Sequence, residues 1–541
     1  MLAILTRFIN QKSNKISSAA MIVAFFGLIS RLFGLWRDRL LAGQFGAGQE
    51  LDIYYAAFRI PDLVYNLLII GAVSSVFIPV FHEYLTKNRE DAWKFAGNTL
   101  NILFITLIAL SAILIFLAPI LVYLVAPGFD AAARNLTVNI SRILLLSPLL
   151  MGISAMAAAL LQAFSRFLIT SLAPIFYNIG IISGIIFLVP RFGIWGLAYG
   201  VILGALFHFL IQVPALFGIG FKFSFGFNFK EVGIIKIIKL WFPRTLGLFA
   251  FQINDVIMTA IASLLSSGSI TIYNFADNLR WVPIGIVGVA FSTVSFPAMS
   301  LAYAQGKKDL FLKRISLATR QAIFIILPIS AMLFVFRKEI VMIVLGTGQF
   351  SAQDARLTAA ILGVFTFGIF ASSLRLLFTR AFFAFHNTKT PVFINIFSAA
   401  INIILAIVFV WFFKKYTYIP AILGLPLSIS IASIVNFAWH WVDLKKHAGD
   451  FGISEIKKSA AKILIASAMA VAAAYVGLYL FSRFFETTDF FGLLFRIFFA
   501  GLLAGATYLI TAILLHSEEL LMFNFFGKPE PIPGESLDDQ Y

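Results

Sequence analysis

Seven ionisable side chains lie close together in the first two apolar segments of the chain: Arg31, Arg37, Asp38, Arg39, Asp52, Arg59 and Asp62. Placing a charge at membrane depth costs roughly 2.5–3.5 kcal/mol on insertion scales, so such residues usually serve a function. In the second segment, steps of 3, 4, 3 and 4 residues align a polar stripe on one helical face: Asp52, Tyr55, Arg59, Asp62 and Asn66. A polar stripe faces protein or water rather than lipid. The sequence therefore predicts a charged cavity inside the bilayer.

Two later apolar segments, 270–303 and 352–384, also place a base among polar residues on one helical face. The members are Tyr273, Asp277 and Arg280 in the first and Ser372, Arg375 and Thr379 in the second. Arginines that converge in a dry cavity suit an anionic phosphate group, because the guanidinium fork binds its oxygens bidentately. The candidates for substrate binding are Arg31, Arg37, Asp38, Asp52, Arg59, Asp277, Arg280 and Arg375. The alternative is that the acid–base pairs are internal salt bridges that hold helices together.

A separate polar stripe in the segment 231–264 suggests an ion site. It consists of Gln252, Asp255, Thr259 and Ser263. A buried carboxylate beside amide and hydroxyl groups can bind Na⁺ or H⁺, which makes Asp255 and Thr259 candidates for a coupling ion. The alternative is an interhelical hydrogen bond, and this is the role that we expect for Asn178, Asn395 and Asn402.

Composition places the chain in a membrane. Hydrophobic residues make up 60% of it, charged residues 12%, and the mean hydropathy is +0.95. Cysteine is absent, which excludes disulfides, thiolate catalysis and Cys-ligated metals. The net charge of +16 does not indicate nucleic acid binding, because the Lys and Arg residues sit in short loops between apolar runs.

Signals for an enzyme are weak. The sequence has neither a Walker A pattern nor HExxH, and its six histidines lack metal-ligand spacing. Leu345–Gly348 is glycine-rich, but it lacks the strand and helix that flank a phosphate-binding loop. We expect a non-enzymatic protein without a cofactor, while a membrane-embedded transferase acting on a lipid phosphate stays open.

Apolar runs of sufficient length predict an all-α polytopic membrane protein with fourteen transmembrane helices. The expected spans are 16–41, 51–85, 92–123, 134–163, 167–189, 193–219, 231–264, 270–303, 310–337, 352–384, 389–414, 418–444, 458–482 and 488–516. Lys and Arg are concentrated at the ends of the even-numbered helices, so both termini should be cytoplasmic. Residues 1–15 are expected to form a basic interfacial segment and 527–541 a disordered acidic tail.

The chain also repeats itself. Ala173–Asn178 matches Thr390–Asn395 at an offset of 217 residues, and Ala72–Pro79 resembles Ala290–Pro297 at an offset of 218. An offset of six helices is even, so the two halves should run in the same direction through the membrane. We therefore expect an N-terminal lobe over 16–219, a C-terminal lobe over 231–444, and two appended helices over 458–516.

Several of these segments resemble the signature of the MurJ (MviN) family. They are Ser30-Arg-Leu-Phe-Gly-Leu-Trp-Arg-Asp38, Phe45-Gly-Ala-Gly48, Asp52, Ala57-Phe-Arg-Ile-Pro61 and Phe77-Ile-Pro-Val80, followed by Ala126–Phe129, Ser165–Phe167, Gly288–Ala290 and Lys389–Pro391. The resemblance implies a bacterial inner-membrane flippase for lipid II, the undecaprenyl-pyrophosphate-linked peptidoglycan precursor. It also implies the fold of the MOP superfamily, with two six-helix lobes and two further helices that form a groove for the lipid tail. Membrane lipids and the cell-wall synthesis machinery are the implied partners.

The chain departs from the family pattern in the cavity. Tyr65-Asn66 replaces adjacent arginines, Ile70 replaces a glutamate, and Asn278 stands where the family has arginine. Part of the family's cationic lining is therefore missing. Two alternatives follow: a flippase for another polyprenyl-linked glycan, or an ion-coupled multidrug-type antiporter driven through Asp255. In either transporter, Na⁺, H⁺ or the membrane potential would supply the driving force. A scaffold for cell-wall enzymes is a third possibility.

Overall fold

The computed structural model describes residues 16–70, 76–484 and 489–522, and the regular secondary structure in this part of the chain is helical, without β-strands. Eleven helices in it are long and apolar enough to cross a membrane. The prediction of a multi-pass all-α membrane protein is therefore confirmed. The other three expected spans fall in the helical regions 16–45 and 232–263 and, for the second span, in the described helical residues 49–70 and 76–85. The count of fourteen stays a prediction. The interfacial segment 1–15, the tail 527–541 and part of the first copy of the repeat (72–75) lie outside the described residues.

The chain divides into two compact units, and each is built from several stretches of sequence. Unit 1 comprises 1–282, 344–365 and 392–432, and unit 2 comprises 283–343, 366–391 and 433–541. Three long helical stretches thus begin in unit 1 and continue in unit 2. The expected lobes and appended helices are continuous stretches of sequence, unlike these two units, and this division stays a prediction.

Unit 1 contains the helices that carry the candidate site residues, with the exception of Arg375. Its elements are α2 (Ile16–Phe45), α3 (Gln49–Val64), η1 (Tyr65–Ile70), α4 (Ile78–Leu85), α5 (Arg89–Val125), α6 (Ala131–Leu144), α7 (Ser147–Ala163), α8 (Phe167–Ser183), η3 (Gly184–Leu188), α9 (Val189–Phe192), α10 (Trp195–Leu210), α11 (Val213–Gly218), α12 (Val232–Ser263) and α13 (Ser269–Pro283). It also holds the first part of α17 (Ala352–Ala384), most of α18 (Lys389–Tyr416), η5 (Ala421–Leu423) and the start of α19 (Gly424–Ala448).

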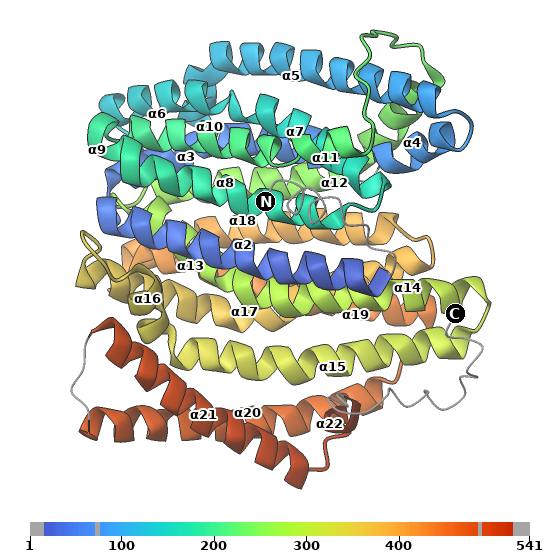
Figure 1. Cartoon of the computed structure of the whole chain (residues 1–541). Coiled ribbons are helices and arrows are strands. Elements are labelled where there is room, and N and C mark those ends of the chain that lie inside the picture. The colour runs from blue at the N-terminus through green and yellow to red at the C-terminus, as the bar shows by residue number, and fades with distance from the viewer. Residues whose placement is uncertain (1–15, 71–75, 485–488, 523–541) are drawn as a thin grey trace, which may run out of the picture. The chain divides into compact units, whose positions relative to one another are not determined.

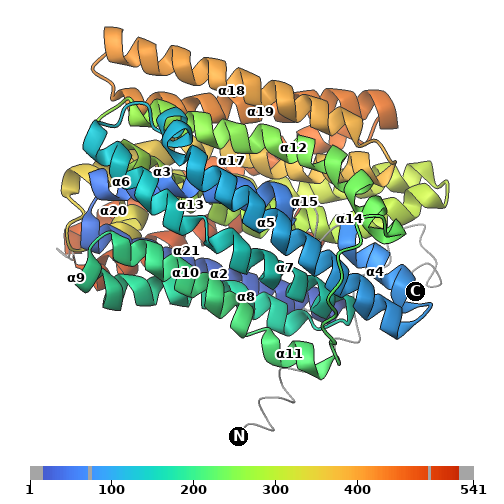
Figure 2. The same cartoon turned by 90° about the horizontal axis from the view of Figure 1, so that it is seen from above.

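Small residues allow the helices of unit 1 to pack closely. Helix α8 packs against both α2 and α10, as Figure 2 shows. At the contact of α8 with α10, a Cβ atom added to Gly180 would stand 2.2 Å from the Cα atom of Gly204. Without a water-driven hydrophobic effect between helices, such close backbone approach is a main source of stability in a membrane.

Unit 2 contains a helical hairpin packed on a long helix. Its elements are η4 (Ile284–Val289), α14 (Ala290–Ala304), α15 (Lys308–Val335), α16 (Arg337–Leu345), α20 (Ile453–Phe484), α21 (Phe490–Leu514) and α22 (Glu519–Met522), with the remaining parts of α17 and α19. Helices α20 and α21 pack against each other and α20 packs on α15, as Figure 1 shows. The hydroxyl of Tyr508 on α21 donates to the carbonyl of Phe324 on α15 over 2.6 Å.

An ionic cluster fastens the end of this hairpin to α15. Arg320 lies 2.6 Å from the carboxylate of Glu518 and 2.7 Å from that of Glu519. Burial by itself would raise the pKa of Glu519, but hydrogen bonds and the charge of Arg320 outweigh it and hold this pKa below its ordinary value. The pair is therefore charged at neutral pH.

Among the described residues, three helical stretches contain a π-helical segment with defined bounds. Segments η1 and η3 lie in unit 1, and η4 lies in unit 2. Segment η1 begins at Tyr65 and η4 at Ile284, which is close to the offset of the sequence repeat. In each case a proline stands just before the segment, Pro61 in α3 and Pro283 at the end of α13. π-helical turns are rare and often occur at functional sites.

Candidate functional site

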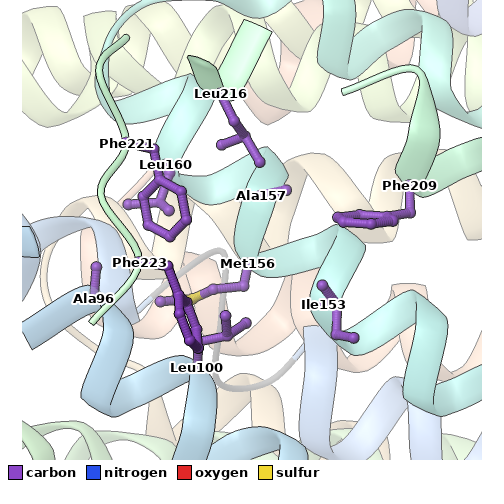
Figure 3. Close-up of a pocket in the computed structure, with 10 residues that line it drawn as sticks. All are labelled: Ala96, Leu100, Ile153, Met156, Ala157, Leu160, Phe209, Leu216, Phe221 and Phe223. Atoms are coloured by element: carbon purple, nitrogen blue, oxygen red, sulfur yellow. The ribbon is translucent and has the colours of Figure 1, made fainter. Parts of the chain in front are cut away.

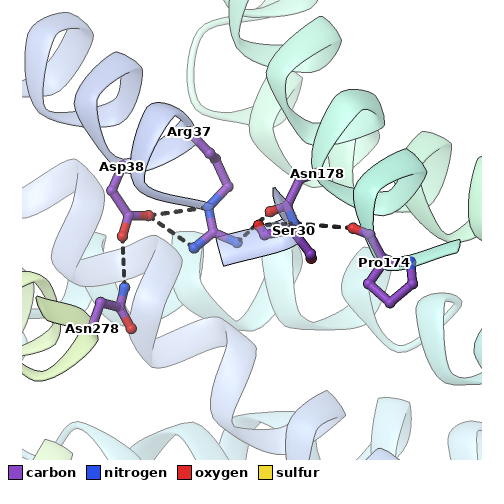
Figure 4. Close-up of polar contacts among 6 residues, drawn as sticks. All are labelled: Ser30, Arg37, Asp38, Pro174, Asn178 and Asn278. Atoms are coloured by element: carbon purple, nitrogen blue, oxygen red, sulfur yellow. Dashed lines mark hydrogen bonds and ion pairs between the residues drawn. The ribbon is translucent and has the colours of Figure 1, made fainter. Parts of the chain in front are cut away.

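The centre of the polar cluster in unit 1 is an ion pair on α2. The Nη2 atom of Arg37 lies 2.8 Å from Oδ1 of Asp38, and its Nε atom donates to the same oxygen over 3.1 Å. Asn278 on α13 donates to the other oxygen, Oδ2, over 2.8 Å. Figure 4 shows Asp38 between its two hydrogen-bond donors, with Arg37 on one side and Asn278 on the other. The Asp38 side chain is only 3% exposed, so these partners replace the water that its carboxylate oxygens would otherwise bind.

Asn178 on α8 links the same arginine to a second helix. Its Oδ1 atom accepts from Nη1 of Arg37 over 3.3 Å, and its Nδ2 atom donates to the carbonyl oxygens of Ser30 and Pro174. Asn178 therefore makes the interhelical contact that the sequence suggested. Asn402 on α18 also makes an interhelical contact, because its Nδ2 atom donates to Oδ1 of Asn254 on α12 over 2.7 Å.

Arg59 on α3 reaches two other helices of unit 1. Its Nε atom donates to Oγ1 of Thr259 on α12 over 2.8 Å, and its Nη2 atom donates to Oδ1 of Asn274 on α13 over 2.9 Å. The charges of Asp62 and Asp255 lie close enough to interact with its guanidinium group. Arg59 therefore stands among two carboxylates and two neutral acceptors, and Thr259, a candidate for the coupling ion, is one of its partners.

Asp52 at the start of α3 is bound to the first turn of α13. Its Oδ2 atom accepts from the backbone N–H of Gly268 over 2.7 Å, and its Oδ1 atom accepts from the N–H and hydroxyl of Thr271 over 2.8 and 2.7 Å. The residue is only 3% exposed. A carboxylate at a helix N-terminus satisfies free N–H groups and interacts favourably with the helix dipole. This geometry gives Asp52 a structural role, and a role in substrate binding stays a prediction.

The remaining candidates of α13 form a pair within the helix. Nη2 of Arg280 lies 2.5 Å from Oδ1 of Asp277. The guanidinium carbon of Arg280 also lies 4.3 Å from the centroid of the Phe365 ring, which is a cation–π contact. Arg31 on α2, in a more exposed position, donates to the carbonyl of Trp281 over 2.8 Å.

Arg375, the remaining candidate for substrate binding, belongs to unit 2. It lies on α17, where its carbonyl accepts from the hydroxyl of Thr379 over 2.9 Å. His440 on α19 lies within the range of its charge, and the hydroxyl of Ser372 donates to that of Ser433 on α19 over 3.1 Å. The polar face predicted on α17 therefore has polar partners on α19.

Sequence reasoning missed Thr271 and Asn274, and it had noted Asn278 only as a departure from the family's cavity lining. Thr271, Asn274 and Asn278 are neutral, yet each binds a charged residue of α2 or α3. Their spacing of i, i+3 and i+7 is the signal that could have identified them, because it places them on one face of α13.

Negative charge balances positive charge in this cluster. The sequence candidates and their charged neighbours in unit 1 comprise four arginines (Arg31, Arg37, Arg59 and Arg280) and five aspartates (Asp38, Asp52, Asp62, Asp255 and Asp277). An anionic ligand gains from such a site only if it displaces an internal carboxylate or if an acid binds a cation. Within the described ranges, no group of three or more His, Asp or Glu side chains is arranged to hold a metal ion.

The fold is that of transporters of the MOP superfamily. An inward-facing multidrug resistance MATE family transporter of that superfamily matches 81% of this chain and 99% of its own, with a TM-score of 0.65 at 16% identity. This likeness concerns the fold alone. A lipid II flippase MurJ in an inward closed conformation matches 92% of this chain and all of its own, with a TM-score of 0.76 at 25% identity.

The sequence identifies the family. The model of the lipid II flippase MurJ family matches residues 41–499. A probable lipid II flippase MurJ of Buchnera aphidicola subsp. Acyrthosiphon pisum is 30% identical over 94% of this chain and 98% of its own length. The lipid II flippase MurJ of Burkholderia cenocepacia is 28% identical over 79% of this chain and 83% of its own. The chain belongs to the lipid II flippase MurJ family, which confirms the resemblance seen in the sequence.

Proposed function

We propose that the protein is a lipid II flippase that works by alternating access. The observation that carries this proposal is the buried polar cluster of unit 1, in which Arg37 and Arg59 stand among apolar helices of a MurJ family member. A phosphate-linked headgroup needs such cations to leave water, while its polyprenyl tail can stay in lipid. Translocation is transport without a catalytic step.

The finer architecture belongs to the same proposal. We infer fourteen transmembrane helices in two six-helix lobes, 16–219 and 231–444, with 458–516 forming the groove for the lipid tail. Basic loop charge favours the bacterial inner membrane with both termini in the cytoplasm. The cell-wall synthesis machinery, which consumes lipid II outside, is the expected partner.

Substrate binding should involve a rearrangement of the cluster. We infer that the pyrophosphate displaces Asp38 from Arg37 and takes its place at the guanidinium fork, because a phosphate and a carboxylate compete for the same donors. Arg31, Arg59, Arg280 and Arg375 are further candidates. The released negative charge needs compensation, and a proton or Na⁺ at Asp255, beside Thr259, would supply it. This cation would also couple transport to an ion gradient.

Rescue of cells depleted of their own lipid II flippase tests the function. Wild type should restore growth, whereas Arg37→Ala and Arg59→Gln should fail at equal membrane levels. Loss of one buried charged hydrogen-bond donor is worth about 1.5–3 kcal/mol, or about a tenfold to hundredfold loss of substrate affinity. Arg142→Ala is the matched control, because Arg142 on α6 bonds to Ile115 and Asn139 rather than to the cluster.

The outcomes separate the alternatives. Failure of well-expressed wild type, together with drug efflux that depends on Asp255, would support the antiporter instead. Failure without efflux would favour another polyprenyl-linked glycan, with Tyr65 and Asn278 as the first positions to change. Rescue by all cluster variants would contradict transport through this site and support a scaffold.

A further inference from the structure

An unusual segment joins α11 to α12. Residues 221–230 read Phe-Lys-Phe-Ser-Phe-Gly-Phe-Asn-Phe-Lys, with phenylalanine at every second position. The segment has no helical or strand structure, and we call it the aromatic strap. In Figure 1 it is the green chain that crosses α5 near α4. Because it connects the sixth and seventh expected spans, we expect it to lie at one surface of the membrane.

Two amide side chains of α5 hold the backbone of the strap. Asn98 donates to the carbonyl of Asn228 over 3.0 Å and accepts from the N–H of the same residue over 2.8 Å. Asn101 donates to the carbonyls of Ser224 and Gly226, each over 3.2 Å. These bonds replace a sheet partner for the extended backbone and fix its orientation on α5.

The phenylalanines of the strap differ in their surroundings: the Phe221 ring packs edge-on against Trp93 of α5, whereas the later rings are largely exposed. Alternate residues of an extended chain share a face, and the phenylalanines alternate with the residues whose carbonyls bind Asn98 and Asn101. Four rings are at least half exposed, namely Phe223 (50%), Phe225 (82%), Phe227 (51%) and Phe229 (56%). Aromatic rings beside lysines are typical of elements that insert into the boundary between lipid headgroups and acyl chains.

An apolar cavity lies where the strap begins. It has a volume of about 180 Å³ and no polar side chain in its lining. Figure 3 shows Phe221 and Phe223 of the strap on one side of it, with Leu100, Ala157 and Phe209 among the other lining residues. An apolar cavity of about 150 Å³ stays free of water and binds small hydrocarbons. The end of an acyl chain is therefore a suitable occupant.

The charges around the strap favour an anionic headgroup. Acids near the strap already have partners: Glu83 is paired with Lys236, Glu90 with Lys94, and Glu231 accepts from Asn98. Lys222 and Lys230 are exposed near the two ends of the phenylalanine series, and neither forms an ion pair within the described residues, although the pKa of Glu90 is lowered by the hydrogen bond and charge of Lys94 and, to a smaller extent, by the charge of Lys222. Each basic residue near an anionic lipid surface is worth about fivefold in affinity.

We propose that the aromatic strap and the cavity beside it form a docking site for an anionic phospholipid. One acyl chain enters the cavity between Phe221 and α7. The phosphate lies at the lysines, and the remaining phenylalanines rest in the leaflet. The bound lipid would anchor the connection between the sixth and seventh expected spans to the membrane surface.

Native mass spectrometry of the purified full-length protein tests the proposal, with phosphatidylglycerol and phosphatidylcholine supplied in equal amounts. Wild type should retain more phosphatidylglycerol than phosphatidylcholine. The double variant Lys222→Gln/Lys230→Gln should lose about 25-fold in affinity for it and little for phosphatidylcholine. Ala157→Phe, which fills the cavity from α7, should weaken retention of both lipids. The matched control is Lys457→Gln/Lys458→Gln, which removes two exposed lysines at the start of α20 and should change nothing.

A second comparison tests the phenylalanine face. Phe225 and Phe116 are both 82% exposed, but Phe116 lies on α5 away from the strap. Phe225→Ala should weaken retention of phosphatidylglycerol and Phe116→Ala should not. Equal retention of the two lipids by wild type, or equal losses in the strap and control variants, would overturn the proposal. Displacement of phosphatidylglycerol by an equal amount of undecaprenyl pyrophosphate would also overturn it, because the site would then belong to the transported lipid.

Discussion

The helix formed by α3 and η1 and the helix formed by α13 and η4 are built alike but use their polar residues differently. Both begin with a polar stripe, both carry a proline, and both pass into a π-helical segment at positions close to the repeat offset. In α3, the charged residues Asp52 and Arg59 bind other helices. In α13, Asp277 and Arg280 form an ion pair with each other, and neutral side chains make the hydrogen bonds to α2 and α3.

The two π-helical segments differ in a corresponding way. In η1, the carbonyl of Leu67 accepts from the indole N–H of Trp241 on α12 over 3.0 Å. In η4, Gly288 allows the backbone to approach α17, where an added Cβ atom would stand 2.8 Å from the Cα atom of Ser373. One π-helical segment therefore has a side-chain hydrogen bond from its neighbour, and the other has a close backbone approach. The two related helices have therefore kept the same backbone form, while the contacts of their π-helical segments with neighbouring helices have diverged.

The largest effect is expected for Asp52→Ala, because the contact of α3 with α13 depends on this carboxylate. The change leaves three donors of Gly268 and Thr271 without an acceptor, and it should lower the free energy of unfolding by on the order of 3–4 kcal/mol. Thermal unfolding of the purified protein in detergent measures the loss. Asp130→Ala is the control, since Asp130 accepts only from the N–H of Ala133 at the start of α6 and its loss should cost about 1 kcal/mol. Equal losses would show that Asp52 is an ordinary helix cap.

A smaller effect is expected for Gly288→Ala, which tests close packing in η4. The new methyl group would overlap the backbone of α17, and overpacking of this kind costs about 2 kcal/mol. The melting temperature should fall. Gly501→Ala on α21 provides the control, because an added Cβ atom there meets no atom within 4 Å, and it should leave stability unchanged or slightly raised. If both variants melt alike, η4 does not depend on close approach.

Substitutions in the ion pair of α13 can show whether Arg280 has a structural role or binds substrate. Asp277→Asn alone leaves Arg280 without its acid and should destabilise by about 1–2 kcal/mol, whereas Asp277→Asn combined with Arg280→Gln should restore most of the loss. Unfolding measurements on the two variants test this directly. If the double variant is stable and still rescues flippase-depleted cells, Arg280 has only a structural role. If it is stable but inactive, Arg280 is a substrate ligand and α13 contributes charge to the site as α3 does.

The helices that contain α3 and α13 could be predicted from the sequence, but the residues that bind their charged side chains could not. Length and apolarity defined the spans, and the spacing of Asp52 and Arg59 defined their common face. Gly268, which binds Asp52, lies 216 residues further along the chain, and no local pattern connects the two. Neutral residues such as Asn274 were overlooked because a search for chemistry starts from charges.

The π-helical segments could not be predicted either. A π-helical turn differs from an α-helical one by a single residue in its hydrogen-bond register, so an apolar run such as that of η1 has the same composition in either state. Whether a turn widens depends on contacts made after folding, such as the one between Trp241 and Leu67. The sequence repeat did place η1 and η4 at related positions, which suggests that the wider turn belongs to the duplicated framework.

The smallest effect is expected for Trp241→Phe, which removes the hydrogen bond that distinguishes η1 from η4. The ring volume is largely kept, so the loss should be about 1 kcal/mol from one neutral hydrogen bond. Hydrogen exchange of the amides in η1 should rise in this variant and stay unchanged in η4. Trp411→Phe is the control, because Trp411 is exposed on α18, where it contacts Lys415 rather than a π-helical carbonyl. Equal exchange in η1 with and without the Trp241 indole would mean that both π-helical segments are maintained by packing alone, and the difference between the two helices would then lie only in their charges.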